Sequence, residues 1–416
     1  MLPPREFMTY SIRVVVLAAA MAIALPAVHA QQIPFEDVVR NLRNPDPKVR
    51  LSALQLLREA QHLEAIKPIA PLVNDPIEEI QLEALATELS FYLVADAPAK
   101  RKVGFVLEIR SKGVAPQLFE QGPMVAWPRP VPPELVDALI KALDDEGGRV
   151  RSEAAYTLGI IGRAPLTADE SAGLIKALDH YDPAIRTAAA RVIGRLQVKS
   201  ASDTLIKAIN DSSEQVRFAS MRALGDLKDE SAVQALTEQL KYYGKGEGAW
   251  AALDALAHIA HPSSVPLFKA RLNDKDEFIR RAAAEGLART GDASELSTLQ
   301  AGASTDPSPM TRAAMTFAMQ KLGQNYLTRL VDFLNSSRLA PQVQGYLREL
   351  GPEIVPALMP RLQEPDADVR AQVAEALGAL GDTSTVAVLN PLTKDRDRGV
   401  VMAATQAIDR IKMTRR

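Results

Sequence analysis

The sequence predicts an all-α protein, an α-solenoid of about eleven short helical hairpins wound as a right-handed superhelix. Three observations support this fold class. One phrase recurs at short, regular intervals, each copy carries a helix-start signal, and no segment of useful length alternates with the period of a strand. Hydrophobic residues make up 47% of the chain but aromatic residues only 5%. The core therefore rests on Leu, Ala, Val and Ile, as in thin helical layers.

The recurring phrase consists of Asp, often Pro, a few polar residues, Val or Ile, Arg, and then an Ala-rich stretch that ends in Leu-Gly. Successive copies lie about 26 to 35 residues apart, a spacing that accommodates two short helices and two turns. Clear copies begin at Asp46, Asp182, Asp211, Asp274 and Asp366, arginine markers stand at 50, 151, 186, 217, 280, 312 and 370, and degenerate copies place Gln81, Trp250 and Gln344 in the same phase.

Each phrase is expected to open a helix. An Asp before Pro can accept hydrogen bonds from the free N–H groups of a first turn, while Pro occupies the first helical position without loss. Within the copy that contains Arg217, the apolar residues from Val216 to Leu227 fall on one helical stripe. The Leu-Gly pairs suit close packing or a left-handed helix end. A second, shorter helix is predicted in each unit, for example over residues 135–143, 172–178, 232–240 and 354–362.

The N-terminus predicts a secretory signal peptide over residues 1–30. Arg5 and Arg13 precede an apolar run over residues 14–25, and small residues follow up to Ala30, after which cleavage is expected. The run is about a dozen residues long, whereas a membrane-spanning helix needs about 20. A start at Met8 would leave this interpretation unchanged. We therefore expect a periplasmic or secreted protein without a membrane span after cleavage.

The mature chain divides into N-terminal repeats (31–96), an irregular Pro-rich insert or divergent repeat (97–133), and a repeat array with a C-terminal cap (134–416). In the insert, residues 124–133 hold too many prolines to be helical throughout. Two interpretations stay open. The insert is a stiff connector whose Trp127 packs on the solenoid edge, or it is a docking loop that presents Trp127 and Arg129 to a partner.

The phrase and its spacing resemble the HEAT-repeat superfamily, especially the short bacterial units described as phycobilisome-lyase-like HEAT repeats. The resemblance implies that one helix of each hairpin lines a concave face. It also implies a structural role for the recurring arginines, which would bond carbonyls or turn carboxylates of adjacent units. These arginines are Arg50, Arg151, Arg186, Arg217, Arg280 and Arg370.

A concave face would carry the partner-binding residues. Side chains two, five and six positions after the Val or Ile of the phrase lie away from the packing stripe. Aromatic, Met and Arg side chains are enriched in protein-interface hot spots. The alternative is that Phe218 and Met221 pack against the next unit. The candidate ridge consists of Tyr156, Arg191, Phe218, Met221 and Arg222.

The sequence offers little evidence for a catalytic, metal-binding or nucleic-acid-binding site. A formal net charge of −2 with mixed signs argues against a nucleic-acid footprint, and the chain contains no cysteine. Nucleophile-elbow, Walker and His-Glu-x-x-His motifs are absent from the sequence. His258 and His261 with Asp254 form only a weak ligand set, because Pro262 ends their helix. We expect no metal, cofactor or catalytic residue.

The predicted function is therefore that of an exported, non-catalytic scaffold that binds a protein or peptide partner on its concave face. The alternative is an enzyme or cofactor-handling protein of the HEAT-like lyase or oxidoreductase-associated type. Metal or pigment bound to the purified protein would favour the alternative, and an exposed interaction ridge would favour the scaffold.

Overall fold

The computed structural model describes residues 34–94, 114–163 and 165–414. The predicted signal peptide lies outside these residues. In the described part of the chain, helices form eleven hairpins, and the extended pairing is limited to an isolated bridge between Leu93 and Ala126. The all-α solenoid expected from the sequence is confirmed.

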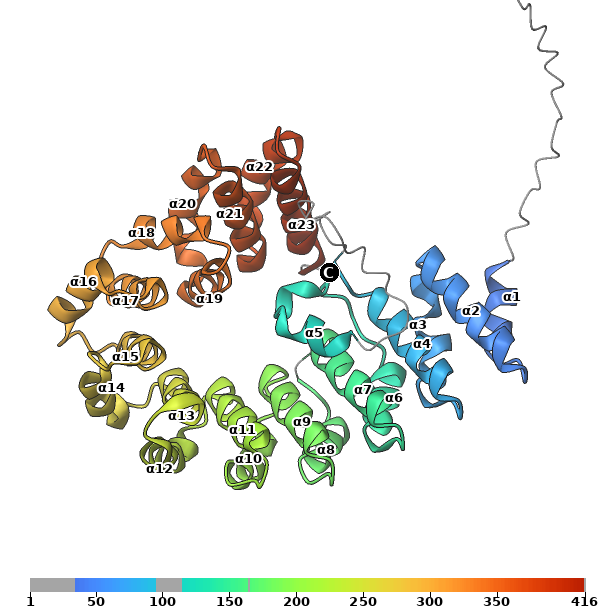
Figure 1. The fold of residues 1–416 in the computed structure, drawn as a ribbon. Helices are drawn as coiled ribbons and strands as arrows, with labels where there is room; N and C mark the ends of the chain where they lie inside the picture. The colour runs from blue at the N-terminus through green and yellow to red at the C-terminus, as the bar shows by residue number, and fades with distance from the viewer. Residues whose placement is uncertain (1–33, 95–113, 164, 415–416) are drawn as a thin grey trace, which may run out of the picture.

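One set of helices lines the inside of a curved array and the other set covers its outside (Figure 1). The inner helices are α2 (Pro47–Ala60), α4 (Glu78–Ser90), α7 (Gly148–Ile161), α9 (Pro183–Arg195), α11 (Glu214–Leu227), α13 (Gly246–Ile259), α15 (Glu277–Thr290), α17 (Pro309–Lys321), α19 (Ala340–Leu350), α21 (Ala367–Leu380) and α23 (Arg398–Thr414). The outer helices are α1 (Phe35–Asn41), α3 (Ile66–Ile69), α6 (Pro133–Lys141), α8 (Ala168–Ala177), α10 (Ser202–Ala208), α12 (Val233–Tyr243), α14 (Val265–Arg271), α16 (Leu296–Thr305), α18 (Leu327–Asp332), α20 (Val355–Leu358) and α22 (Val386–Leu389). The short helix α5 (Ala115–Glu120) of the insert belongs to neither set and lies on the inner side, against α7.

The inner helices begin where the repeated phrase predicts. Asp46 and Asp182 each precede a proline at the first helical position and accept a hydrogen bond from the N–H two residues on, at 2.9 Å. Asp276 and Asp366 cap α15 and α21 in the same way. The phrase therefore sets the start of the helices that form the inner face.

The Leu-Gly pairs serve both roles expected from the sequence. A Cβ atom at Gly225 would lie 2.8 Å from the Cα of Ala255, and one at Gly378 would lie 2.7 Å from the Cα of Ala407. Neighbouring inner helices therefore touch at glycines where a larger side chain would force them apart. Gly381, with φ of +72°, ends α21 in the left-handed conformation.

The recurring arginines form an arginine ladder along the array, in which one rung is the contact from one repeat to the next. In a full rung, Nη1 donates to two backbone carbonyls of the preceding turn, and Nε and Nη2 donate to a carboxylate of the next repeat. Arg186 contacts Asp211 at 2.8 and 2.7 Å, and Arg280 contacts Asp306 at 2.8 and 2.9 Å. These side chains are mostly buried, so the charge pairs are shielded from water.

The other rungs vary in their acceptor. Arg50 and Arg370 make the bidentate contact to Asp75 and Asp395, Arg151 reaches Asp182 through Nη2, and Arg217 donates to the Tyr243 hydroxyl at 2.6 Å. Where the marker is not arginine, Trp250 donates to Asp276, Gln81 to Asp145, and Gln344 to Gln372. Each donor spans an interface between adjacent hairpins, which is where a solenoid gains its stability.

The array curves until α23 comes back beside the insert near α4 and α5, and this contact is the ring junction (Figure 1). Nη2 of Arg410 donates to the carbonyl of Met124 at 2.8 Å, across 286 residues of sequence. The same guanidinium lies over the Trp127 ring, 5.6 Å from its centroid. A cavity of about 480 Å3 is lined from both sides, by Phe91, Leu93 and Trp127 and by Met402 and other residues of α23.

Glu88 in α4 is fully buried, although glutamate is seldom buried without a partner. The residue is 0% exposed, and neither carboxylate oxygen has a hydrogen-bond partner. Burial raises the pKa of Glu88 well above its usual range. The folded chain therefore keeps a proton that the unfolded chain releases above about pH 4.3. The free energy of unfolding therefore falls as the pH rises from about 4.3 through the pKa of Glu88 in the folded chain.

Replacing Glu88 with Gln removes this titration. We expect Glu88→Gln to match the natural chain in stability near pH 4 and to exceed it at pH 7. The measurement is urea unfolding at both pH values. Other carboxylates titrate equally in the two proteins, so a difference that is the same at pH 4 and pH 7 would contradict the assignment.

Candidate partner-binding surface

The predicted ridge on the inner helices is only partly exposed. Arg222 pairs with Glu247 of α13 at 3.1 Å, and both side chains are about half exposed. Met221 is fully buried, Phe218 is 7% exposed and packs edge to face on Tyr243, and Tyr156 is 8% exposed. The prediction of an exposed aromatic and methionine ridge is therefore wrong at these three positions. The next hairpin covers Phe218 and Met221, with Tyr243 of α12 against Phe218, and Phe119 of α5 packs on Tyr156.

Arg191, the remaining ridge residue, belongs to a cluster around Phe119. It pairs with Glu120 and lies over the rings of Phe119 and Tyr156, at 5.2 and 5.6 Å from their centroids. Arg195 covers the same phenyl ring at 3.5 Å and donates to the Phe119 carbonyl at 2.9 Å. Arg191, Arg195 and Arg222 line a cavity of about 390 Å3 together with Asp226. This part of the inner surface presents three guanidinium groups, of which Arg191 is paired with Glu120 and Arg222 with Glu247.

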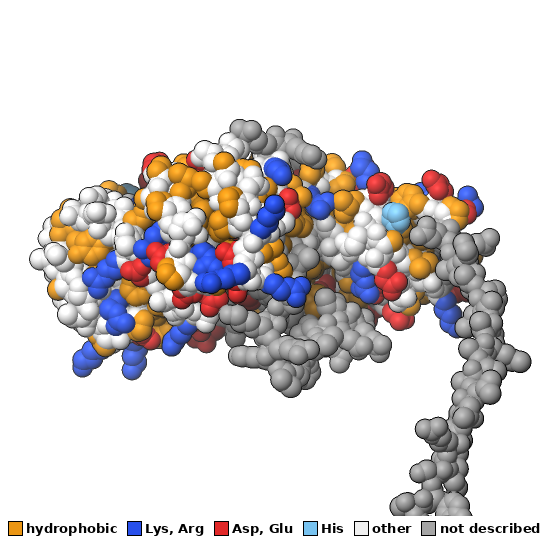
Figure 2. Space-filling model, turned by 90° about the horizontal axis from the view of Figure 1, so that it is seen from above, with side chains coloured by type: hydrophobic (Ala, Val, Ile, Leu, Met, Phe, Trp, Pro, Cys, Tyr) orange, Lys and Arg blue, Asp and Glu red, His pale blue; other side chains and the backbone are white. Residues whose placement is uncertain are grey.

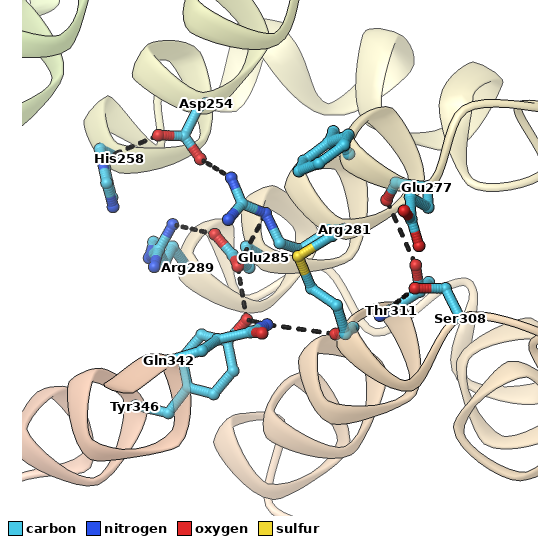
Figure 3. Close-up of polar contacts among 12 residues, drawn as sticks. Asp254, His258, Glu277, Arg281, Glu285, Arg289, Ser308, Thr311, Gln342 and Tyr346 are labelled. Carbon is cyan, nitrogen blue, oxygen red and sulfur yellow. Dashed lines mark hydrogen bonds and ion pairs between the residues drawn. The ribbon is translucent and has the colours of Figure 1, made fainter. Parts of the chain in front are cut away.

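Further along the array, charged side chains of α13, α15 and α19 form a continuous polar network (Figure 3). Asp254 accepts from Nη2 of Arg281 at 2.8 Å and lies 3.9 Å from Nδ1 of His258. Glu285 accepts from the Tyr346 hydroxyl at 2.5 Å and pairs with Arg289. The network thus continues the contacts between hairpins on the inner side of the array.

The network extends to α17 and α19 through one shared carboxylate. Arg289 donates to Glu349 at 3.0 Å, and Nζ of Lys321 lies 3.4 Å from the same residue. Burial acts to raise the pKa of Glu349, but these two cations outweigh it and hold the pKa below its usual range. Glu349 is therefore ionised at neutral pH.

The pKa of Asp254 is set by the same two opposing effects, burial and neighbouring positive charges. Burial acts to raise it, but the charges of Arg281 and His258 prevail and lower it. Burial and the neighbouring Glu285 carboxylate raise the pKa of the Tyr346 hydroxyl well above its usual range, so it stays protonated and donates. These groups are held by partners in fixed states. The arrangement suits rigid contacts between hairpins better than proton transfer.

Sequence reasoning missed most of this network. The sequence pattern singles out Asp254 only as a weak metal ligand, and it does not single out Glu285, Arg289 or Glu349. A signal was present, because Arg191, Arg222 and Glu285 share the position six residues after the phrase's Val or Ile. The contacts themselves join helices up to 61 residues apart and could not be read from one sequence.

Trp127 and Arg129 lie at the ring junction. Both are partly exposed and line the cavity between the insert and α23. The backbone of Trp127 is fixed by two contacts, from its N–H to the Tyr92 carbonyl at 2.7 Å and from Arg163 to its own carbonyl at 2.7 Å. Trp127 therefore packs on an edge of the solenoid, and the residue across from it is Arg410.

In residues 34–94, 114–163 and 165–414, no three His, Asp or Glu side chains converge in a way that would hold a metal ion. Nδ1 of His261 instead accepts from the Ser263 N–H in the turn after α13. No helix of this same part combines the length and apolar character needed to cross a membrane. On the face drawn in Figure 2, Lys and Arg side chains lie among Asp and Glu side chains.

The pattern that defines HEAT repeats matches residues 171–242, 245–320 and 347–415, together more than half of the chain. The chain belongs to the HEAT repeat family. The matched segments run from α8 to α23 and include most of the inner polar network. The hairpins formed by α1 and α2, by α3 and α4, and by α6 and α7 continue the same architecture before the first matched segment.

Solved structures with a similar fold include an engineered protein, at 19% identity over 91% of this chain and 98% of that chain with a TM-score of 0.40. Another is the complex of CpcE and CpcF of phycocyanin lyase from Nostoc, at 19% identity over 61% of this chain and 95% of that chain with a TM-score of 0.37. Comparison with curated proteins finds no match.

Proposed function

We propose that this HEAT repeat protein is an exported, non-catalytic scaffold that binds a protein or peptide partner on the inner surface of its array. The observation that supports the proposal most directly is the cluster of Arg191, Arg195 and Arg222 around a cavity on the inner helices. Arginine presents a planar fork that recognises carboxylates and carbonyls, and it is enriched in protein interfaces. The signal-peptide pattern of residues 1–30 supports export.

The inner surface has the rigidity that binding without chemistry requires. Arg191 is held by two aromatic rings and Glu120, and Arg195 by the Phe119 ring and carbonyl, so neither guanidinium must be ordered when a partner binds. Arg222 is the most exposed of the three. It is therefore the residue that a partner reaches first.

The test uses tagged mature protein, residues 31–416, and captures partners from its native envelope for identification by mass spectrometry. Arg222→Glu is expected to abolish capture of a stoichiometric partner, because it reverses one charge of the cluster. Lys207→Glu on the outer helix α10 makes the same charge change on an exposed residue and is expected to keep the partner. Equal capture by both variants would contradict the inner-surface assignment.

The alternative function, an enzyme or cofactor-handling protein of the HEAT-like lyase type, is distinguished in the same sample. A metal assay and an absorbance spectrum are recorded on the captured protein. A stoichiometric metal or chromophore in the absence of a protein partner would replace the scaffold proposal with the alternative.

A further inference from the structure

The arginine ladder follows a rule of spacing. In the four bidentate rungs, the carboxylate lies 25 or 26 residues after the arginine, in the turn that leads into the next inner helix. In each case this aspartate also accepts the N–H two residues on, which fixes the carboxylate toward the arginine. The aspartates are Asp75, Asp211, Asp306 and Asp395.

Arg312 departs from this rule and forms the open rung. Its Nη1 makes the usual contacts, to the carbonyls of Asp306 at 2.6 Å and Pro307 at 3.4 Å. Its Nε and Nη2 have no hydrogen-bond partner among the described residues. Positions 337 and 338, where the carboxylate would stand, are occupied by Ser337 and Arg338, and both side chains are exposed. Neither position carries the acid that completes the other rungs.

A cavity of about 510 Å3 lies between the two turns involved. Pro307 and Ser308 line it on the side of α17, and Ser336 and Arg338 line it on the side of α19. Gln342 of α19 donates to the Met310 carbonyl at 3.1 Å, which holds the two turns together. The cavity is therefore built from the same turns that form a closed rung elsewhere in the array.

The charges around this cavity favour an anion. Lys275, Arg280 and Arg338 line it, with Glu277 as the acidic residue of the lining. Arg280 is already neutralised by Asp306, whereas Arg338 has no ion-pair partner among the described residues. Arg312 is not itself a lining residue, but it donates to the carbonyl of Pro307, which is one. The lining thus carries an excess of positive charge, together with the hydroxyl groups of Ser308 and Ser336.

We propose that the open rung at Arg312 binds an aspartate or glutamate side chain from an acidic segment of the partner protein. This inference rests on the proposed scaffold function and names the chemistry of its partner. The incoming carboxylate takes the position that the chain's own aspartate occupies in other rungs, and it accepts from the free edge of Arg312 and from Arg338. The apolar lining of Pro307, Pro309, Met310 and Leu339 suits a peptide segment better than a free ion.

The first test adds the missing carboxylate to the chain itself. Ser337→Asp places a carboxylate 25 residues after Arg312, at the spacing of the other rungs. We expect a higher melting temperature than that of the natural chain, no gain for Ser337→Asn, and loss of the gain in the double variant with Arg312→Met. A gain that persists without Arg312, or no gain at all, would overturn the geometry. If Arg312→Met folds poorly, Arg312→Lys replaces it in the double variant.

The second test supplies the carboxylate as a ligand. The probe is acetyl-Asp-Ser-Ser-amide, the sequence of the chain's own turn at 211–213, and its control is acetyl-Asn-Ser-Ser-amide. Binding is followed by NMR of the labelled methyl group of Met310, which lines the cavity. We expect the aspartyl peptide to shift this signal in the natural chain. Binding should be absent in Ser337→Asp and about tenfold weaker in Arg312→Met.

Two results would reject the ligand class. Equal shifts by the aspartyl and asparaginyl peptides would show that charge is not recognised. Inorganic phosphate that shifts Met310 at the same concentration, without any preference for the aspartyl peptide, would make the site one for small anions.

The outcomes separate this inference from the proposed function. A captured partner that is lost on Arg222→Glu but retained on Ser337→Asp supports the scaffold and overturns the role of the open rung. If the natural chain captures no partner, the scaffold proposal fails, and the inference that depends on it fails with it.

Discussion

Arg280→Met is expected to destabilise the interface between α15 and α17 by about 3–5 kcal/mol, because it leaves Asp306 buried without its cation. The Asp306 side chain is 7% exposed, so water compensates little for the lost guanidinium. The same substitution removes the contacts from Nη1 to the carbonyls of Asp274 and Lys275. Hydrogen exchange of the α15 and α17 amides measures the effect, together with urea unfolding.

Two controls isolate the carboxylate contact in this prediction. Arg312→Met removes the same kind of carbonyl contacts but no carboxylate contact, and it should cost clearly less. Arg280→Met combined with Asp306→Asn should recover part of the loss, since the buried charge is removed as well. Because a solenoid is stabilised by neighbouring repeats, the loss of protection should concentrate near α15 and α17. A uniform loss over all hairpins would contradict the local role of the rung.

Arg410→Glu is expected to open the ring junction. The substitution removes the hydrogen bond to the Met124 carbonyl and places a carboxylate against that oxygen and the face of the Trp127 ring. Both contacts become repulsive, because carbonyl oxygens and aromatic faces carry negative partial charge. The radius of gyration from small-angle X-ray scattering should increase, while helix content by circular dichroism stays the same.

Lys412→Glu is the matched control for this change. Lys412 lies on the same helix, is exposed, and undergoes the same reversal of charge. Its scattering curve should match that of the natural chain. If Arg410→Glu gives that same curve too, the junction is held by contacts other than Arg410.

The sequence predicted the repeats well because each repeat is encoded locally. The Asp-Pro starts at Asp46 and Asp182 and the glycine at 381 act within one hairpin, and the ladder arginines recur at a fixed phase. The second helices predicted over 172–178 and 232–240 correspond to α8 and α12. The insert is the part of the chain that departs most from this local pattern.

The inner surface was harder to predict because its exposure depends on how neighbouring hairpins pack. Periodicity places Phe218 and Met221 off the packing stripe of their own helix, but the next hairpin covers them with Tyr243 and α13. Periodicity also leaves Arg222 exposed, and the structure agrees. The partner of Trp127 lies 283 positions away in the sequence, beyond the reach of any local pattern.

The ring junction also bears on how the molecule folds. Nearly all other contacts join a hairpin to the next one along the chain, so they can form as soon as two units exist. The contact between Arg410 and Met124 requires the whole array between them to take its curvature first. During synthesis, the insert is finished hundreds of residues before α23 exists. We therefore expect junction closure to follow the formation of the array during folding.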